Sequence, residues 1–244
     1  MANELRPQHH SIKGLLAAAV IVGLWALSLG VLLTVEMAAL PWWSVPLAVA
    51  WQTLLYTGLF ITAHDAMHGT VTPDFPRLND AIGRLAVTLY ALFSYRRLRQ
   101  EHFRHHDHPV SSEDPDFHGE DGAGFGQWYL RFMVTYLSVI QLLGMAAVFN
   151  LLQHLVGVAL LNLVVFWVVP ALASTVQLFY FGTYLPHRLP PQGHDEPHRA
   201  TSNDYPPWLS LVTCFHFGYH REHHERPDLP WWRLPAYRKH CVEG

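Results

Sequence analysis

The stretch "LLAAAVIVGLWALSLGVLLTV", residues 15–35, contains no charged side chain. A helix needs about 20 mostly apolar residues to cross the hydrocarbon core of a bilayer, and this stretch is long enough. Three further stretches have the same character, at residues 46–63, 129–149 and 155–184. A fifth, residues 81–95, is shorter and carries Arg84, so we expect an interfacial or re-entrant helix there. The pattern predicts an all-α integral membrane protein with four transmembrane helices.

Composition supports the membrane interpretation. Hydrophobic residues make up 50% of the chain and charged residues only 14%, against roughly 25% charged in an ordinary soluble domain. A buried helix of a soluble protein could explain one apolar stretch, but not four. The net charge of −3 and the absence of a basic run interleaved with aromatic residues give no indication of nucleic-acid binding. We therefore expect a single membrane-embedded domain over residues 1–244.

The distribution of lysine and arginine predicts the orientation. These residues precede the first span, lie between the second and third, and follow the fourth, whereas the connections 36–45 and 150–154 contain none. Short loops with an excess of positive charge stay in the cytoplasm. Both termini are therefore expected to be cytoplasmic, with a cytoplasmic cap formed by residues 64–128 and 185–244. The first span is longer than the apolar region of a signal peptide and lacks a convincing cleavage site, so we expect it to remain as an anchor.

Histidine is concentrated in three short motifs among the 18 histidines of the chain: "HDAMH" at 64–68, "HFRHH" at 102–106 and "HREHH" at 220–224. Residues three and four apart lie on one face of a helix, with Cβ atoms about 5–6 Å apart. All three motifs fall on the predicted cytoplasmic side, as does the histidine of "YLPHR" after the fourth span. The nine candidate metal ligands are His64, His68, His102, His105, His106, His187, His220, His223 and His224.

The size of this set argues for two metal ions. A tetrahedral zinc site takes four ligands, so nine histidines suit two metals of higher coordination number. Imidazole binds iron, copper, nickel and zinc, and the ligand type alone does not choose among them. Metal-bound imidazole usually donates its second ring nitrogen to a neighbouring group. Candidates for that supporting role are Asp65, Asp107, His216, Glu222 and Glu225, and His108 stays unassigned.

Two other classes of protein share parts of this pattern. An isolated histidine pair is more often a helix surface, but "HDAMH" also has the spacing of the zinc peptidase motif, with Asp65 where the general base would be. That interpretation leaves the other motifs unexplained. A metal transporter or buffer would need polar groups lining a path within the spans, and charges there are nearly absent.

Longer phrases around the motifs carry a resemblance to a known family. "HDAMHG", "HFRHHDHP", "FGTYLPHR" and "FHFGYHREHHERPDLPWWRLP" resemble the bacterial-type carotenoid 4-ketolases, which are membrane di-iron oxygenases related to fatty-acid desaturases and hydroxylases. The histidine motifs alone are typical of the whole superfamily, and the phrase ending in "PWWRLP" favours the ketolases. The resemblance covers nearly the whole chain from residue 15. A fatty-acyl desaturase or hydroxylase with the same metal site remains the alternative.

The resemblance implies a reaction and its cofactors. Two ferrous ions held by the nine histidines would use O2 to oxidise C4 of the β-ionone rings of β-carotene. Two successive hydroxylations and loss of water would give ketones of the echinenone and canthaxanthin type, on the route to astaxanthin. The chain shows no flavin or nicotinamide fingerprint and has only two cysteines, so electrons must come from outside. We expect a ferredoxin-like donor at the arginine-rich face, and a location in the bacterial inner membrane.

Overall fold

Helices make up all the regular structure in the described part of the chain. The computed structural model describes residues 11–119, 122–190, 193 and 195–243. Four helices are long and apolar enough to cross a membrane, as predicted. They are α1 (Ser11–Thr34), α2 (Ser44–Met67), the helix Val139–Val156 and the helix Leu160–His187. The last two contain α6 (Val139–Leu151), η2 (Leu152–Val156), α7 (Leu160–Asn162), η3 (Leu163–Val168), α8 (Val169–Phe179), η4 (Tyr180–Tyr184) and α9 (Leu185–His187).

The third membrane-length helix is displaced from the predicted range 129–149. The chain first forms a separate helix, α5 (Phe125–Tyr136), and then breaks at residues 137–138. Ser138 caps the next helix, because its hydroxyl accepts a hydrogen bond from the Gln141 N–H at 3.2 Å. Serine favours this position, where it satisfies a backbone donor that has no partner within the helix. The apolar run continues across the break, so hydropathy alone placed the span too early.

The predicted interfacial segment 81–95 is divided between two helices. The first, α3 (Pro76–Ala91), begins with a proline and ends at Leu92, whose φ is 55°. The second, α4 (Tyr95–Asp107), begins after Ser94, whose hydroxyl accepts from the Arg97 N–H at 3.4 Å. The amphipathic α3 packs along α2, burying Ala86, Val87 and Tyr90. It thereby positions α4 beside the last turn of α2.

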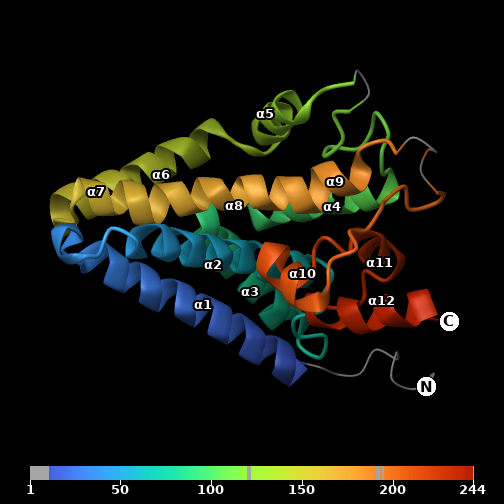
Figure 1. The fold of residues 1–244 in the computed structure, drawn as a ribbon, viewed down its shortest axis with the longest axis horizontal. Helices are drawn as coiled ribbons and strands as arrows, with labels where there is room; N and C mark the ends of the chain where they lie inside the picture. Colours follow the sequence, from blue (N-terminus) through green and yellow to red (C-terminus); the bar gives the residue numbers. More distant parts are fainter. Residues whose placement is uncertain (1–10, 120–121, 191–192, 194, 244) are drawn as a thin grey trace.

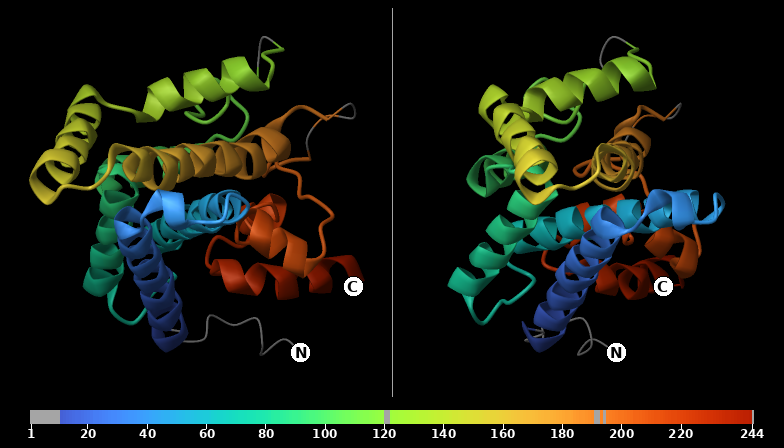
Figure 2. Two further views of the ribbon diagram at one scale, coloured as in Figure 1. Left: turned by 60° about the vertical axis from the view of Figure 1, so that its left-hand side comes forward. Right: turned by 90° about the vertical axis from the view of Figure 1, so that its left-hand side faces the viewer.

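The C-terminal part of the chain forms a cap at one end of the bundle. Its helices are α10 (Pro207–Cys214), α11 (His220–Glu225) and α12 (Leu234–Glu243), with a short turn of helix η5 (Trp231–Arg233) before α12. They lie at the same end as α4 and α9, on the right in Figure 1, and the left view of Figure 2 also shows the C-terminal helices on the right. The connection from α1 to α2, which contains η1 (Met37–Ala39), and the turn from α6 to α7 lie at the opposite end. The fold therefore gathers the elements that carry the nine predicted ligands at one end.

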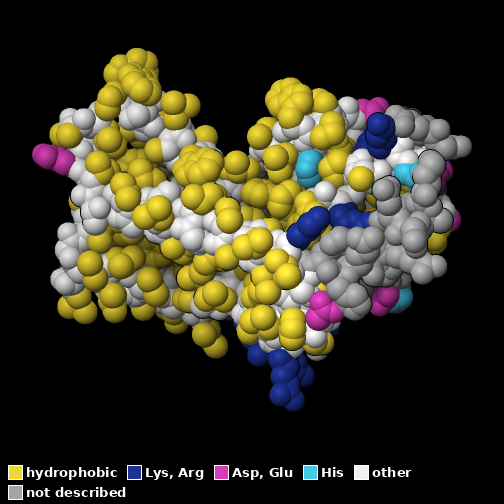
Figure 3. Space-filling view, turned by 90° about the horizontal axis from the view of Figure 1, so that it is seen from below, with side chains coloured by type: hydrophobic (Ala, Val, Ile, Leu, Met, Phe, Trp, Pro, Cys, Tyr) yellow, Lys and Arg dark blue, Asp and Glu magenta, His cyan; other side chains and the backbone are white. Residues whose placement is uncertain are grey.

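The surface is that of a protein that faces lipid along most of its length. Large apolar side chains on α6 are openly exposed, among them Val139 at 72% and Ile140 at 84%. Most charged side chains gather towards one end of the molecule, while hydrophobic side chains dominate the other (Figure 3). Between the spans, the Thr57 hydroxyl donates to Gln177 Oε1 at 2.6 Å. Such hydrogen bonds between helices are a recurrent means of association within a bilayer.

Candidate metal centre

Four elements bring the predicted ligands together. The helix α2 continues four residues beyond its predicted end at residue 63, so that His64 lies on its last turn and His68 caps it. The helix α4 carries the second motif and α11 the third, while His187 ends α9. Because the motif spacings match the helical repeat, each element turns its histidines to one side. All nine predicted ligands meet in the space between these elements.

The nine histidines form two adjacent groups. Within each group, one nitrogen from every ring lies within 4.8 Å of all the others. The rings of His106 and His224, one from each group, stack with centroids 4.2 Å apart, so the groups share a boundary. The five-histidine group consists of His64, His68, His102, His106 and His223. The four-histidine group consists of His105, His187, His220 and His224.

In the five-histidine group the Nε2 atoms point towards a common centre. His68 Nε2 lies 2.6 Å from His102 Nε2, and His106 Nε2 lies 3.0 Å from His223 Nε2. The Nε2 atom of His64 is buried and has no hydrogen-bond partner among the described residues. A buried imidazole nitrogen without a partner is costly unless something binds it. Convergent imidazole nitrogens of this kind suit a transition-metal ion.

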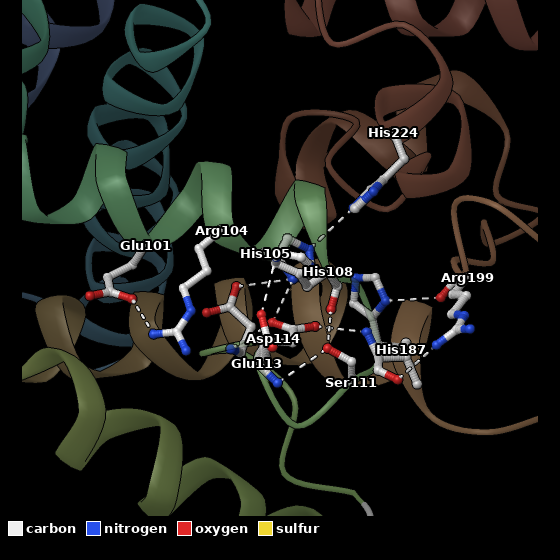
Figure 4. A network of polar contacts seen from close by, with 12 residues as sticks. Glu101, Arg104, His105, His108, Ser111, Glu113, Asp114, His187, Arg199 and His224 are labelled. Atoms are coloured by element: carbon white, nitrogen blue, oxygen red, sulfur yellow. Dashed lines mark hydrogen bonds and ion pairs between the residues drawn. The ribbon is translucent and has the colours of Figure 1, made fainter.

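The four-histidine group is held from behind by hydrogen bonds. His105 Nδ1 donates to Asp114 Oδ1 at 2.9 Å, and His187 Nδ1 donates to the carbonyl oxygen of Arg199 at 3.1 Å (Figure 4). On the inner side, His224 Nε2 lies 3.1 Å from both His105 Nε2 and His220 Nε2. A donated Nδ1 proton leaves the Nε2 lone pair free to bind a metal. Two of the four rings, His105 and His187, are therefore fixed in orientation by an outer hydrogen bond.

Burial keeps most of these imidazoles in the neutral form that binds metals. It lowers the pKa of His68 to about 4. Burial also lowers the pKa well below its ordinary value at His102, His106, His220, His223 and His224. His105 is different: burial lowers its pKa, but the charge and the hydrogen bond of Asp114 outweigh that effect and raise it. The carboxylate of Asp114 would correspondingly increase the basicity of this ligand.

An apolar cavity ends at the five-histidine group. His64 and His102 form part of its wall, and it encloses about 760 Å³ of space, its mouth included. A second groove of about 1050 Å³ extends from it between α6 and α8. The two share five lining residues: Tyr90, Phe93, Met133, Leu137 and Thr175. The shared residues place the cavity and the groove next to each other, and mostly apolar side chains line both; together they are called the apolar passage below.

Comparison with known proteins identifies the fold and its relatives. The fatty acid desaturase family model matches residues 40–147 and 135–243. The chain belongs to this family. It is 44% identical over 229 residues to a beta-carotene ketolase of Paracoccus sp. strain PC1, covering 92% of this chain and 91% of that one. Another beta-carotene ketolase, from Paracoccus sp. strain N81106, is 46% identical over 190 residues, 76% of each chain. The zeaxanthin 4-ketolase of Chlamydomonas reinhardtii is 38% identical over 247 residues, 96% of this chain and 55% of its own.

One functional feature of this desaturase-family member escaped the sequence analysis. Asp114 accepts hydrogen bonds from His105 and from the backbone N–H groups of Val110 and Asp116. The neighbouring Asp116 lies 4.0 Å from the same His105 nitrogen. Both belong to the irregular segment after α4, where no helical spacing links them to the histidines. The signal available in the sequence was the two aspartates in "EDPDF", a few residues after the second histidine motif.

The five predicted supporting residues lie at different distances from the ligand histidines. Asp65 lies 3.6 Å from His64 Nδ1 and accepts a hydrogen bond from the Trp231 N–H at 3.1 Å. None of the five predicted supporting residues forms a hydrogen bond to a ligand histidine in the described part of the chain. Glu222 and Glu225 accept from arginines, Asp107 is exposed, and His216 stacks on Tyr219 and Trp231. The unassigned His108 lies 3.4 Å from Glu113, directed away from the centre.

Proposed function

We propose that this chain is a β-carotene 4-ketolase that holds two ferrous ions and uses O2. The observation that carries the proposal is an apolar passage that opens towards lipid and ends at His64 and His102. A long hydrocarbon dissolved in the bilayer can enter such a passage sideways. Among lipid-soluble substrates, the ketolase relatives that match nearly the whole chain favour a carotenoid.

The two histidine groups fit two iron ions. The five-histidine group and the four-histidine group would each hold one, through imidazole nitrogens that already converge. Bound iron would supply the activation of dioxygen that hydroxylation of a C–H bond requires. An intramembrane zinc peptidase would use only the first histidine motif, and a buffer would need no apolar passage beside the metals. The paired groups therefore favour the oxygenase.

The residues of the chain would bind and orient the substrate. Apolar side chains along the passage would hold the polyene by burying it, and the end wall at His64 and His102 would set how far the ring enters.

Each hydroxylation takes one O2, two electrons and two protons, replaces a C4–H bond by C4–OH, and releases one water. The second gives a gem-diol, which loses water to become the ketone. Exclusion of bulk water by the apolar wall protects the reactive site.

The decisive experiment is expression in bacterial cells that accumulate β-carotene. We expect mono- and diketo products by chromatography and absorption spectroscopy, because the two rings of the substrate are equivalent. The same cells carrying the His223→Ala variant are the control for the host's own oxidation. Unchanged β-carotene together with new double bonds or hydroxyl groups in host acyl chains would instead establish a fatty-acyl desaturase or hydroxylase. That alternative is supported by 25% identity over 276 residues to the chloroplastic omega-6 fatty acid desaturase of Arabidopsis thaliana.

The surface of α4 is where we place the electron donor. Phe103 is 38% exposed, and its ring centroid lies 5.5 Å from that of His68. The guanidinium of Arg99 lies 5.7 Å from the centre of the same ring. An acidic, ferredoxin-like one-electron carrier would therefore meet positive charge beside the partly exposed side of the five-histidine group. Arg99→Gln should raise the KM for such a donor without changing the iron content, and an unchanged KM would place the docking site elsewhere.

The cytoplasmic orientation of the centre is also part of the proposal. Lysine and arginine flank the end of the bundle that holds the histidines, and the connection at residues 36–45 has neither. A reporter fused after Gly244 should be active only in the cytoplasm. A reporter inserted at residues 37–39 should be active only on the outer face of the bacterial inner membrane. Outer-face activity of the C-terminal fusion would reverse the topology.

A further inference from the structure

A carboxylate and a phenol lie together in the wall of the otherwise apolar cavity. Asp116 and Tyr136 both line the space that ends at His64 and His102. The Tyr136 hydroxyl donates a hydrogen bond to Asp116 Oδ1. The other oxygen, Asp116 Oδ2, lies 4.0 Å from His105 Nδ1. The pair thus stands at the inner end of the cavity, beside both histidine groups.

The surrounding fold does not depend on this pair for its position. The Asp116 N–H donates to Asp114 Oδ1 at 2.8 Å, and Trp128 Nε1 donates to the Asp116 carbonyl oxygen at 2.8 Å. Asp114 already accepts the His105 proton. These contacts hold the backbone of the segment and orient His105 without the Asp116 side chain. The Asp116 charge also lies near His105, but neither the backbone contacts nor the His105–Asp114 hydrogen bond needs the hydrogen bond between the carboxylate and the phenol at the cavity wall.

A hydrocarbon substrate gives no reason for polar groups at this place. Burial of a carboxylate beside an apolar cavity is unfavourable unless the group is hydrogen-bonded or paired. β-Carotene offers no donor or acceptor, so the pair cannot contribute to binding it. The species with a polar group in this position is the ring after its first oxidation, when C4 carries a hydroxyl. That alcohol can donate to a carboxylate oxygen and accept from a phenol.

We propose that Tyr136 and Asp116 bind the C4 hydroxyl of the alcohol intermediate and so retain it for the second oxidation. The alcohol enters between the two groups: its O–H donates to an Asp116 oxygen, and its oxygen accepts the single Tyr136 proton, which then no longer goes to Asp116 Oδ1. The second hydroxylation then replaces the remaining C4–H bond, using one O2, two electrons from the external donor and two protons, and releasing one water. Loss of a further water from the gem-diol gives the ketone. This inference rests on the proposed ketolase function and identifies the residues that make the product a ketone.

The test compares two tyrosine-to-phenylalanine variants of α5. Tyr136→Phe removes the proposed contact, whereas Tyr129→Phe removes a hydroxyl two turns earlier that lies 2.6 Å from Thr175 Oγ1. In cells that make β-carotene, Tyr136→Phe should raise the ratio of 4-hydroxy to 4-keto products about tenfold. That is the order expected when a hydrogen bond to a buried polar group is lost. Consumption of β-carotene should stay within about threefold of the unmodified chain, and Tyr129→Phe should leave the ratio within about twofold.

A second measurement supplies the alcohol directly. With purified holoenzyme, Tyr136→Phe should raise the KM for a 4-hydroxylated carotenoid about tenfold and leave the KM for β-carotene nearly unchanged. Asp116→Asn keeps an acceptor for the phenol. It should raise the ratio of 4-hydroxy to 4-keto products and the KM for the 4-hydroxylated carotenoid by less than Tyr136→Phe does. A merely structural role would lower turnover of both substrates in parallel and leave the product ratio constant.

The outcomes separate this inference from the proposed function. If the unmodified chain makes ketones but Tyr136→Phe gives the same product ratio, the retention role is overturned and the ketolase function stands. If the unmodified chain makes no ketone, the function itself fails. Immunodetection in the membrane fraction monitors folding. If both the Tyr136→Phe and the Asp116→Asn chains were missing from the membrane fraction, the pair would be needed for folding. That result would also overturn the inference.

Discussion

The two histidine groups differ in how they are surrounded. All four rings of the four-histidine group are buried, and two of them donate hydrogen bonds to fixed acceptors, His105 to Asp114 and His187 to the Arg199 carbonyl. In the five-histidine group, His68, His102 and His106 are partly exposed. Among the described residues, Asp65 is the one carboxylate within 4 Å of a ring nitrogen of this group, at 3.6 Å from His64 Nδ1. We call the four-histidine group the braced group, because hydrogen bonds hold two of its rings from outside. We call the partly exposed five-histidine group the open group.

This difference suggests that the two histidine groups have different roles. The apolar cavity ends at His64 and His102, which belong to the five-histidine group, and Phe103 connects the same group to the surface. Substrate and electrons would therefore arrive at the open group. The braced group lies behind it, where hydrogen bonds fix ring orientation and a nearby carboxylate increases ligand basicity. This asymmetry would allow the open group to react with substrate while the braced group keeps its geometry.

The largest effect is expected from removing one ligand in either group. His223→Ala and His105→Ala should each lose most of the bound iron and nearly all ketone formation, because the groups share a boundary at His106 and His224. Iron per chain is measured on purified protein by elemental analysis. His108→Ala is the matched control from α4's end, since His108 lies against Glu113 and away from the centre. Full iron and normal turnover in either ligand variant would refute the assignment.

A smaller effect should follow from loosening the braced group. Asp114→Asn keeps the size of the side chain but removes the charge that supports His105. Loss of such a partner typically lowers metal affinity by 10–100-fold, and we expect a decrease in that range, measured by competition with a chelator. Glu113→Gln, at an exposed neighbouring position, should leave the affinity unchanged. If Asp65→Asn weakened iron binding as strongly as Asp114→Asn, the contrast between the groups would disappear.

The smallest effect should come from narrowing the passage to the open group. Ala146 lines the groove between α6 and α8, whereas the adjacent Ala147 is also exposed but is not among the residues that line the groove. Ala146→Trp should slow β-carotene conversion several-fold with iron content unchanged, because the indole would occupy space that the polyene needs. Ala147→Trp faces lipid and should have little effect. Equal rates for the two variants would mean that the substrate takes another route.

Much of this protein could be predicted from local patterns. Long apolar stretches predicted the membrane-spanning helices, because the length of a helix that crosses hydrocarbon is set by the bilayer. Helical spacing within each histidine motif predicted rings on a common face, because neighbours on a helix depend only on local geometry. All nine predicted ligands meet in the structure. Their binding of iron remains a prediction.

Other features depended on contacts between residues far apart in the sequence. The division into groups of five and four places His105 and His106, neighbours in one motif, in different groups. Successive residues of a helix point about 100° apart, so the partners of each are chosen by how α2, α4, α9 and α11 pack, which no single motif specifies. The support of His105 by Asp114 depends on an irregular segment folding back on α4. Short-range periodicity therefore determined which residues could be ligands, and only the tertiary structure decided which of them act together and what holds them.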